Sequence, residues 1–138
     1  MESGTFPVSR KAPFLSNLNV LDNIKLINDN VQHFSKTSSE ALVLEKLKSL
    51  GLNELARVHH STLSDIEMFL MQLIRACIKN NHAMIIDSPF LMVPTQKDVT
   101  FLLDAISMLD LECEDILVID ISSQAHKYKE EFCHIEEC

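Results

Sequence analysis

The chain has 138 residues, 46% of them apolar, which suits a single domain with a hydrophobic core. Its net charge of -8 disfavours nucleic acid and anionic lipid as partners. Four cysteines without a C-x-x-C pair, and no leader or membrane-length apolar run, predict a reduced cytoplasmic setting. We expect no direct membrane insertion, and a position at the inner face of a membrane only through a partner.

The segment before residue 36 predicts one short strand and one helix. Thr5–Val8 has the apolar character of a strand, and Pro7 fits a strand only at the edge of a sheet. Asn17 is a suitable cap for a helix over about 18–34, because apolar residues recur there at three- and four-residue steps.

Two further helices are expected before residue 60. The polar stretch 36–39 indicates a break, and Ser38 or Ser39 starts a helix that Gly51 ends in the left-handed conformation. A short helix over about 53–58 follows. It leads to His59 and His60, whose side chains should point apart in a solvated loop and not share a metal.

The stretch 63–90 predicts a helix followed by a buried strand. Ser61 or Thr62 can cap this helix. Its apolar residues form one face, made by Ile66, Phe69, Leu70, Leu73, Ile74 and Cys77. The run 83–86 is apolar without alternation, as in a strand covered on both faces. Asp87 ends the strand, and Ser88-Pro89 forces a turn, at the place where open α/β sheets bind ligands.

The last third of the chain predicts a helix, a strand and a final helix. Thr95 and Asp98 have capping-box spacing and open a helix that runs to about Leu109. A second apolar strand covers 116–119. Ser122 or Ser123 can cap a last helix over about 123–136.

The order and spacing of these motifs resemble the ATPase domain of ATP-binding cassette (ABC) transporters. In that family an LSGGQ signature is followed by a helix ending in Arg-Ala, four apolar residues and Asp-Glu-Pro. This chain has Leu63-Ser64, Arg75-Ala76 and Asp87-Ser88-Pro89 at matching spacings. Segments 13–24, 47–52 and 116–119 are similar to flanking parts of the family's domain, so the resemblance covers roughly residues 8–125.

The resemblance implies an α/β fold, a truncated P-loop NTPase-like core with a small parallel sheet flanked by helices and a helical subdomain. We expect one domain over 1–138. It divides into a helical subdomain (about 18–62), a core remnant (about 5–12 and 63–125) and a C-terminal helix (about 123–136). The implied strand order is the segment near residue 8, then 83–86, then 116–119. Without a P-loop strand the edge 116–119 is open, and we expect the C-terminal helix or a second copy of the chain to cover it.

The residues that carry the family's chemistry are missing. The phosphate-binding loop G-x-x-x-x-G-K-S/T is absent, since Gly4 and Gly51 lie in no such pattern. The family's functional positions hold Arg10 in the Q-loop, Leu63, Ser64, Asp65, Ile66 and Glu67 in the signature, Asp87 and Ser88 in Walker B, and Ile121 at the switch histidine. At the signature positions, side chains in place of glycine block the close approach of backbone and phosphate. The carboxylates of Asp65 and Glu67 also repel a phosphate. We therefore expect no ATP or Mg²⁺ cofactor, no metal and no catalytic residue.

Other candidate sites have simpler explanations. Asp87 is expected to cap a neighbouring loop rather than hold Mg²⁺. Cys133, His134 and Cys138 form a terminal cluster that we expect to be unligated. Ser64 lacks a nucleophile elbow, so it does not indicate covalent catalysis.

Three functions fit this sequence, and the first is preferred. It is an ABC transporter ATPase-like pseudoenzyme that acts as a protein-binding or regulatory component of a transporter. Its partner would be a transporter membrane subunit or a complete ABC ATPase, docked on residues 13–60, where the family's groove receives a coupling helix. The second is an ATP-binding subunit whose site a partner chain completes, with Asp87 and Ser64 contributing. The third is a self-assembling structural domain, paired through 116–119, or a decayed fragment of a longer gene.

Overall fold

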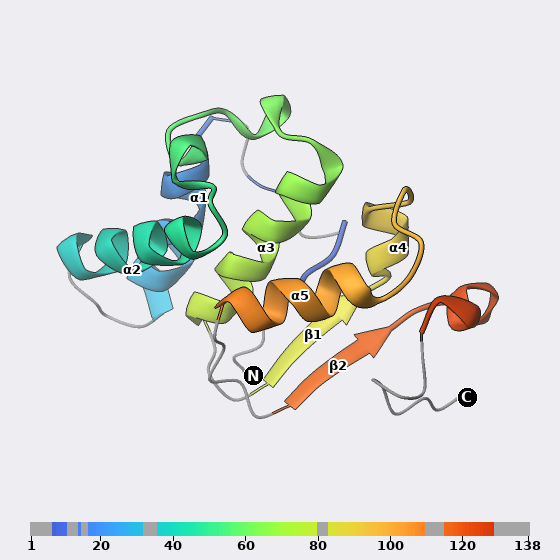
Figure 1. Ribbon diagram of the computed structural model, residues 1–138. Helices are drawn as coiled ribbons and strands as arrows, with labels where there is room; N and C mark the ends of the chain where they lie inside the picture. Colours follow the sequence, from blue (N-terminus) through green and yellow to red (C-terminus); the bar gives the residue numbers. More distant parts are fainter. Residues whose placement is uncertain are drawn as a thin grey trace.

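The computed structural model describes residues 7–10, 14, 17–31, 36–79, 83–109 and 115–128. Its elements are α1 (Val20–Val31), α2 (Lys36–Ser49), η1 (Asn53–Leu55), η2 (His60–Thr62), α3 (Asp65–Lys79), β1 (Ala83–Asp87), α4 (Pro89–Met92), α5 (Thr100–Leu109), β2 (Asp115–Ile119) and η3 (Ser122–Lys127). The architecture is α/β, with α3 and α5 on one face of a small parallel sheet and α1 and α2 beside α3 (Figure 1). Among the described residues, no helix has both the length and the apolar character needed to cross a membrane.

The sheet has the neighbour order expected from the sequence. β1 and β2 pair in parallel, with Ile85 beside Leu117. On the other side of β1, Val8 pairs with Ile86; its N–H donates to the Ile85 carbonyl at 2.9 Å. Val8 contributes only this single bridge, and residues 5 and 6 of the predicted edge strand lie outside the described residues.

The helix α3 forms the centre of the core. The sequence predicts one apolar face, but all six residues from Met71 to Ala76 are buried. α3 packs against α1 and α2, and the Phe69 ring lies 5.3 Å from the Phe101 ring of α5. The prediction of a one-sided helix is wrong because neighbours from both sides of α3 enclose it, and Gln72 and Arg75 are buried with the apolar residues.

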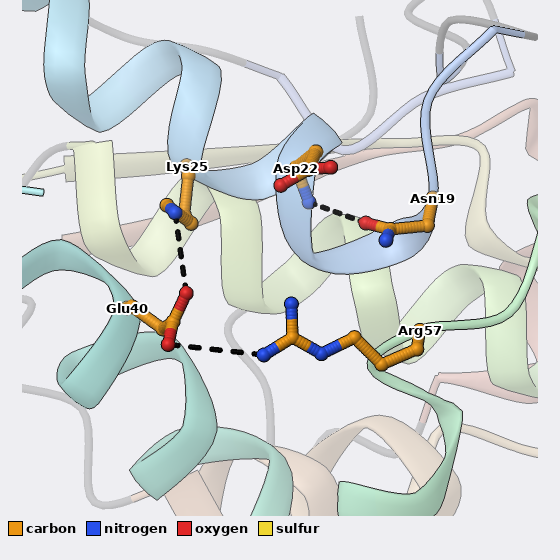
Figure 2. Close-up of polar contacts among 5 residues, drawn as sticks. All are labelled: Asn19, Asp22, Lys25, Glu40 and Arg57. Atoms are coloured by element: carbon orange, nitrogen blue, oxygen red, sulfur yellow. Dashed lines mark hydrogen bonds and ion pairs between the residues drawn. The ribbon is translucent and has the colours of Figure 1, made fainter.

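The helices α1 and α2 begin at other residues than predicted. Asn19, not Asn17, caps α1, because its Oδ1 accepts the Asp22 N–H at 2.8 Å. α2 begins at Lys36, so the predicted polar break at 36–39 is its first turn. The Glu40 carboxylate lies 3.3 Å from Lys25 Nζ and 3.8 Å from Arg57 Nη2, and these ion pairs join both helices to the segment after η1 (Figure 2).

Several predictions after residue 52 are corrected by backbone geometry. The helix over 53–58 shortens to η1, and Ser88-Pro89 leads directly into α4. α5 begins at Thr100, whose N–H donates to Asp98 Oδ1 at 2.9 Å, so the proposed Thr95 capping box does not form. The final α-helix is instead the 3₁₀ helix η3, which no side chain caps. Residues 129–136 of the predicted helix, and the cluster at 133–138, lie outside the described residues.

On one face of the sheet Met84 and Ile86 of β1 are buried and Ile116 and Val118 of β2 are partly buried, while the other face is more exposed in the described part of the chain. Met84 and Ile86 are buried, but Ile85 is only half-buried, which corrects the prediction that both faces of β1 are covered. Leu117 and Ile119 are 56% and 50% exposed. The start of the predicted C-terminal helix turns elsewhere, because the Tyr128 ring packs on Phe90 at 5.3 Å. Within the described residues, the expected cover over β2 is therefore absent.

Gly51 ends α2 as predicted. It has a φ of +72°, and the Leu52 N–H donates to the Leu47 carbonyl at 2.8 Å, which closes a Schellman motif. An added Cβ would meet nothing within 4 Å, so only the backbone conformation opposes a side chain.

We expect Gly51→Ala to lower the free energy of unfolding by about 1 kcal/mol, since an L-residue is disfavoured at positive φ. Urea unfolding measures the change. Gly51→Asn should cost less because Asn tolerates this conformation, and Ser49→Ala controls for a substitution in the last turn. Equal stabilities for Gly51→Ala and the native chain would contradict the conformational argument.

Candidate functional site in a cavity beside α3

A cavity of about 440 Å³ opens beside α3. Its lining comes from four parts of the chain and consists of Arg10, Phe14, His60, Asp65, Met68, Gln72, Leu91, Met92 and Pro94. The volume lies in the range of ligand pockets, and the lining combines apolar side chains with a few polar ones. Leu91 is 58% exposed, so part of the apolar lining is open to solvent. The cavity is therefore the best binding-site candidate in the described part of the chain.

One wall of the cavity is a single face of α3. Asp65, Met68 and Gln72 follow each other at three- and four-residue steps, which places them above one another on the helix. The buried Gln72 accepts the Ser9 N–H through Oε1 at 2.9 Å. The Ser9 hydroxyl in turn donates to Asp87 Oδ2 at 3.3 Å. This chain of hydrogen bonds connects the wall of the cavity to the carboxyl end of β1.

A second wall is built around the Phe14 ring. The Arg75 guanidinium lies 4.7 Å from its centroid, and the His60 ring meets it edge-on at 6.4 Å. Burial lowers the pKa of Arg75 to about 10, because the charged guanidinium is removed from water. Arg75 thus supports Phe14 from inside the core while His60 contacts the ring from another side.

The two histidines do not point apart as predicted. Their rings stack with centroids 4.6 Å apart, because His59 is extended while His60 begins η2. His59 Nδ1 accepts the Ser61 N–H, which makes His59 the cap of η2. The described residues contain no group of three His, Cys, Asp or Glu side chains arranged to hold a metal.

The signature positions form a capping box. The Ser64 hydroxyl accepts the Glu67 N–H at 3.2 Å, and Glu67 Oε1 accepts the Ser64 N–H at 2.9 Å. The predicted caps, Ser61 and Thr62, are wrong, because both residues bond to His59 instead. Ser64 and Glu67, two positions that the resemblance associates with nucleotide, therefore cap the first turn of α3.

Asp87 has the loop-capping role expected of it. Oδ1 accepts the Ser88 hydroxyl at 2.9 Å, while Oδ2 accepts the hydroxyl of Ser9. Ser88 adopts a φ of 53°, a strained value for a residue with a side chain. Its N–H donates to the Ile119 carbonyl at 2.7 Å, which fixes the strained turn against β2.

The structure brings only part of the predicted site together. Arg10 and Asp65 line the cavity; Leu63 and Ile66 are half-buried against the core; Ser64 and Glu67 cap α3; Asp87 and Ser88 lie at the end of β1; and Ile121, after β2, is 61% exposed. Sequence reasoning missed Met68, Gln72, Leu91, Met92 and Pro94 as lining residues. The shared helix face of Asp65, Met68 and Gln72 was the signal that could have indicated the first two.

No protein-family model matches this chain, and a search of curated proteins found no match either. The likeness to ABC ATPases therefore rests on the residues quoted from the sequence.

The capping box can be tested by substitution. Ser64→Ala should lower the free energy of unfolding by about 1 kcal/mol, because the Glu67 N–H loses its acceptor. Thermal and urea unfolding measure this effect. Ser107→Ala, at an exposed position in α5, is the matched control and should change stability little. Equal effects of the two substitutions would show that the cap contributes nothing.

The burial of Arg75 predicts a pH dependence in the variant Arg75→Lys. Lysine has an ordinary pKa of about 10.4, so the same desolvation brings its titration into an accessible pH range. The unfolded chain then holds the proton more tightly than the folded chain. Stability of the variant should be lowest below the folded-state pKa and rise with pH up to the unfolded value.

Urea unfolding between about pH 7 and 10 measures this slope. Arg75→Met has no titrating side chain at position 75. Its unfolding free energy therefore changes with pH only through the other groups of the chain. The same slope in both variants would mean that the side chain at 75 reaches water.

Proposed function

We propose that this chain is a non-catalytic ABC transporter ATPase-like protein that binds a protein component of a transporter through the cavity beside α3. The proposal rests mainly on the position of the cavity. It is lined by Arg10 at the family's Q-loop position, by Phe14 just before the predicted helical subdomain, and by His60 near the end of that subdomain. In the family, the groove between these two parts receives the coupling helix of the membrane subunit.

The lining of the cavity suits a helix of another protein. Met68, Leu91 and Met92 offer flexible apolar side chains, and Arg10 and Asp65 add one charge of each sign. Only Phe14 and His60 belong to the segment 13–60 that the sequence predicts as the docking surface. The proposed surface therefore extends from that segment onto α3 and α4.

The hydrogen bonds that Ser64 and Asp87 make within the chain support a role without ATP hydrolysis. An ATP site completed by a partner chain would need Ser64 and Asp87 to face the partner's nucleotide. The Ser64 hydroxyl and N–H are used in the cap of α3, and both oxygens of Asp87 accept hydroxyl groups. The strand order of Val8, β1 and β2 is compatible with a truncated P-loop NTPase-like core. Such a protein would sit in the cytoplasm, held at the membrane's inner face by its partner.

A substitution at the open side of the cavity tests the docking proposal. Leu91→Asp places a charge among apolar lining residues and should abolish recovery of the partner. Met108→Asp is the matched control, because Met108 is 59% exposed and lies on α5, away from the cavity lining. The measurement is quantitative co-purification of tagged protein from native cells, with the recovered proteins identified by mass spectrometry.

A transporter membrane subunit or a complete ABC ATPase should accompany the native chain and Met108→Asp but not Leu91→Asp. Recovery of no such component by the native chain would overturn the proposal. Calorimetry with ATP and Mg²⁺ tests the non-catalytic part of the proposal. We expect a flat titration, because the chain should not bind the nucleotide. Tight nucleotide binding by the chain alone would contradict a non-catalytic role.

A further inference from the structure

The cavity beside α3 carries one charge of each sign, from Arg10 and Asp65. Both side chains are exposed, and in the described part of the chain neither takes part in an ion pair or a side-chain hydrogen bond. A guanidinium binds carboxylates in a forked geometry, and a carboxylate binds ammonium groups. The cavity therefore suits a ligand that carries both kinds of charge.

The helix sets the distance between the two charged ends of the cavity. Asp65 is the first residue of α3, and Gln72 lies on the same face about two turns later. With a rise of about 1.5 Å per residue, these positions are about 10 Å apart. Arg10 belongs to the Gln72 end, because the preceding residue, Ser9, donates its N–H to Gln72 Oε1 at 2.9 Å. The same bond leaves the amide N–H groups of Gln72 as further donors at this cationic end.

The wall between the two ends is apolar. Met68 lies between Asp65 and Gln72 on the α3 face, and α4 contributes Leu91 and Met92. Methionine side chains adapt to apolar groups of different shapes, and Leu91 is exposed enough to contact a ligand. The matching ligand has an apolar group midway between an ammonium and a carboxylate.

We propose that this cavity binds a short extended peptide with free termini, three residues long and apolar in the middle. An extended chain advances about 3.4 Å per residue, so the two terminal charges of a tripeptide lie about 10 Å apart. The peptide ammonium pairs with Asp65, and its carboxylate accepts hydrogen bonds from Arg10 and Gln72. Its central side chain packs on Met68. The cavity volume of about 440 Å³ is near the lower end of the range for ligand pockets, which suits a few residues.

Other charged ligands match the cavity less well. A free amino acid carries both charges on one carbon atom, so it reaches only one end of the cavity. A dipeptide spans about 7 Å and is also too short. An anion without an ammonium group leaves Asp65 unpaired and is repelled by it.

Bound peptide occupies the cavity to which the proposed function assigns a partner protein. Peptide and partner then compete, so short peptides regulate docking. This competition rests on the proposed function, whereas the binding of the peptide does not.

Titration with Gly-Leu-Gly tests the binding on the full chain, and NMR of the backbone amides reports its place. We expect saturable binding with a dissociation constant below about 5 mM. The amide signals of Met68 and Gln72 should shift, and that of Asp104, exposed on α5, should not. Weaker or non-saturable binding overturns the proposal.

Three control peptides separate charge from spacing. Acetyl-Gly-Leu-Gly lacks the ammonium and Gly-Leu-Gly-amide lacks the carboxylate, so each should bind about fivefold more weakly to the native chain. Gly-Leu keeps both charges at the shorter spacing and should weaken by at least as much. A loss of less than about twofold for any of the three overturns the proposal.

Two variants assign each terminus of the peptide to its residue. Asp65→Asn should remove the effect of acetylation and keep that of amidation, and Arg10→Gln should do the reverse. Asp104→Asn on α5 and Lys48→Gln on α2 change exposed charges outside the cavity lining, so both effects should remain. An undiminished effect of acetylation in folded Asp65→Asn, or of amidation in folded Arg10→Gln, overturns the assignment. If a variant does not fold, the control peptides on the native chain decide.

Co-purification separates this inference from the proposed function. Excess Gly-Leu-Gly should lower the recovery of the partner by the native chain, while acetyl-Gly-Leu-Gly-amide, which lacks both charges, should leave it unchanged. Equal recovery of a transporter component with and without bound Gly-Leu-Gly overturns the competition. If the native chain recovers no such component, the proposed function fails, and the titration still decides whether the cavity binds the peptide.

Discussion

The burial of the middle of α3, from Met71 to Ala76, is the constraint on which the rest of the structure depends. The middle of α3 packs against α1 and α2, and its Gln72 and Arg75 are each only 3% exposed. Gln72 therefore takes its hydrogen bond from the Ser9 backbone, and Arg75 stacks on Phe14. These two contacts hold the segment before α1 against the helix. The cavity beside α3 lies where that segment, His60, α3 and the region of α4 meet.

At the start of α3, the residues that resemble the ABC signature have a structural role. Ser64 and Glu67 bond each other's backbone, so the first turn of the helix is satisfied within four consecutive residues. An anion at this end would have to displace Glu67 and approach Asp65. A similar replacement occurs at Asp87, where two serine hydroxyls occupy the carboxylate oxygens. At both positions the side chains bond to neighbouring groups of the chain itself.

The sheet is the least self-sufficient part of the fold. In the described part of the chain the sheet has two strands with one additional bridge, fewer than a sheet normally needs for independent stability, and the described helices cover one of its faces. Leu117 and Ile119, on the other face, are 56% and 50% exposed. The cavity and the β2 edge lie on different elements of the chain.

The sequence by itself determined the features that short-range rules control. It placed β1 and β2 because uninterrupted apolar runs favour buried strands, and it ended α2 at Gly51 because glycine accepts positive φ. The place of Asp87 at the end of an apolar run also predicted that its carboxylate caps a neighbouring loop. The tertiary structure alone decided the true helix starts at Asn19 and Ser64, the stacking of His59 on His60, and the exposed face of β2. It also decided the cavity, because contacts such as Ser9 with Gln72 join residues 63 positions apart, and no local pattern encodes such a meeting.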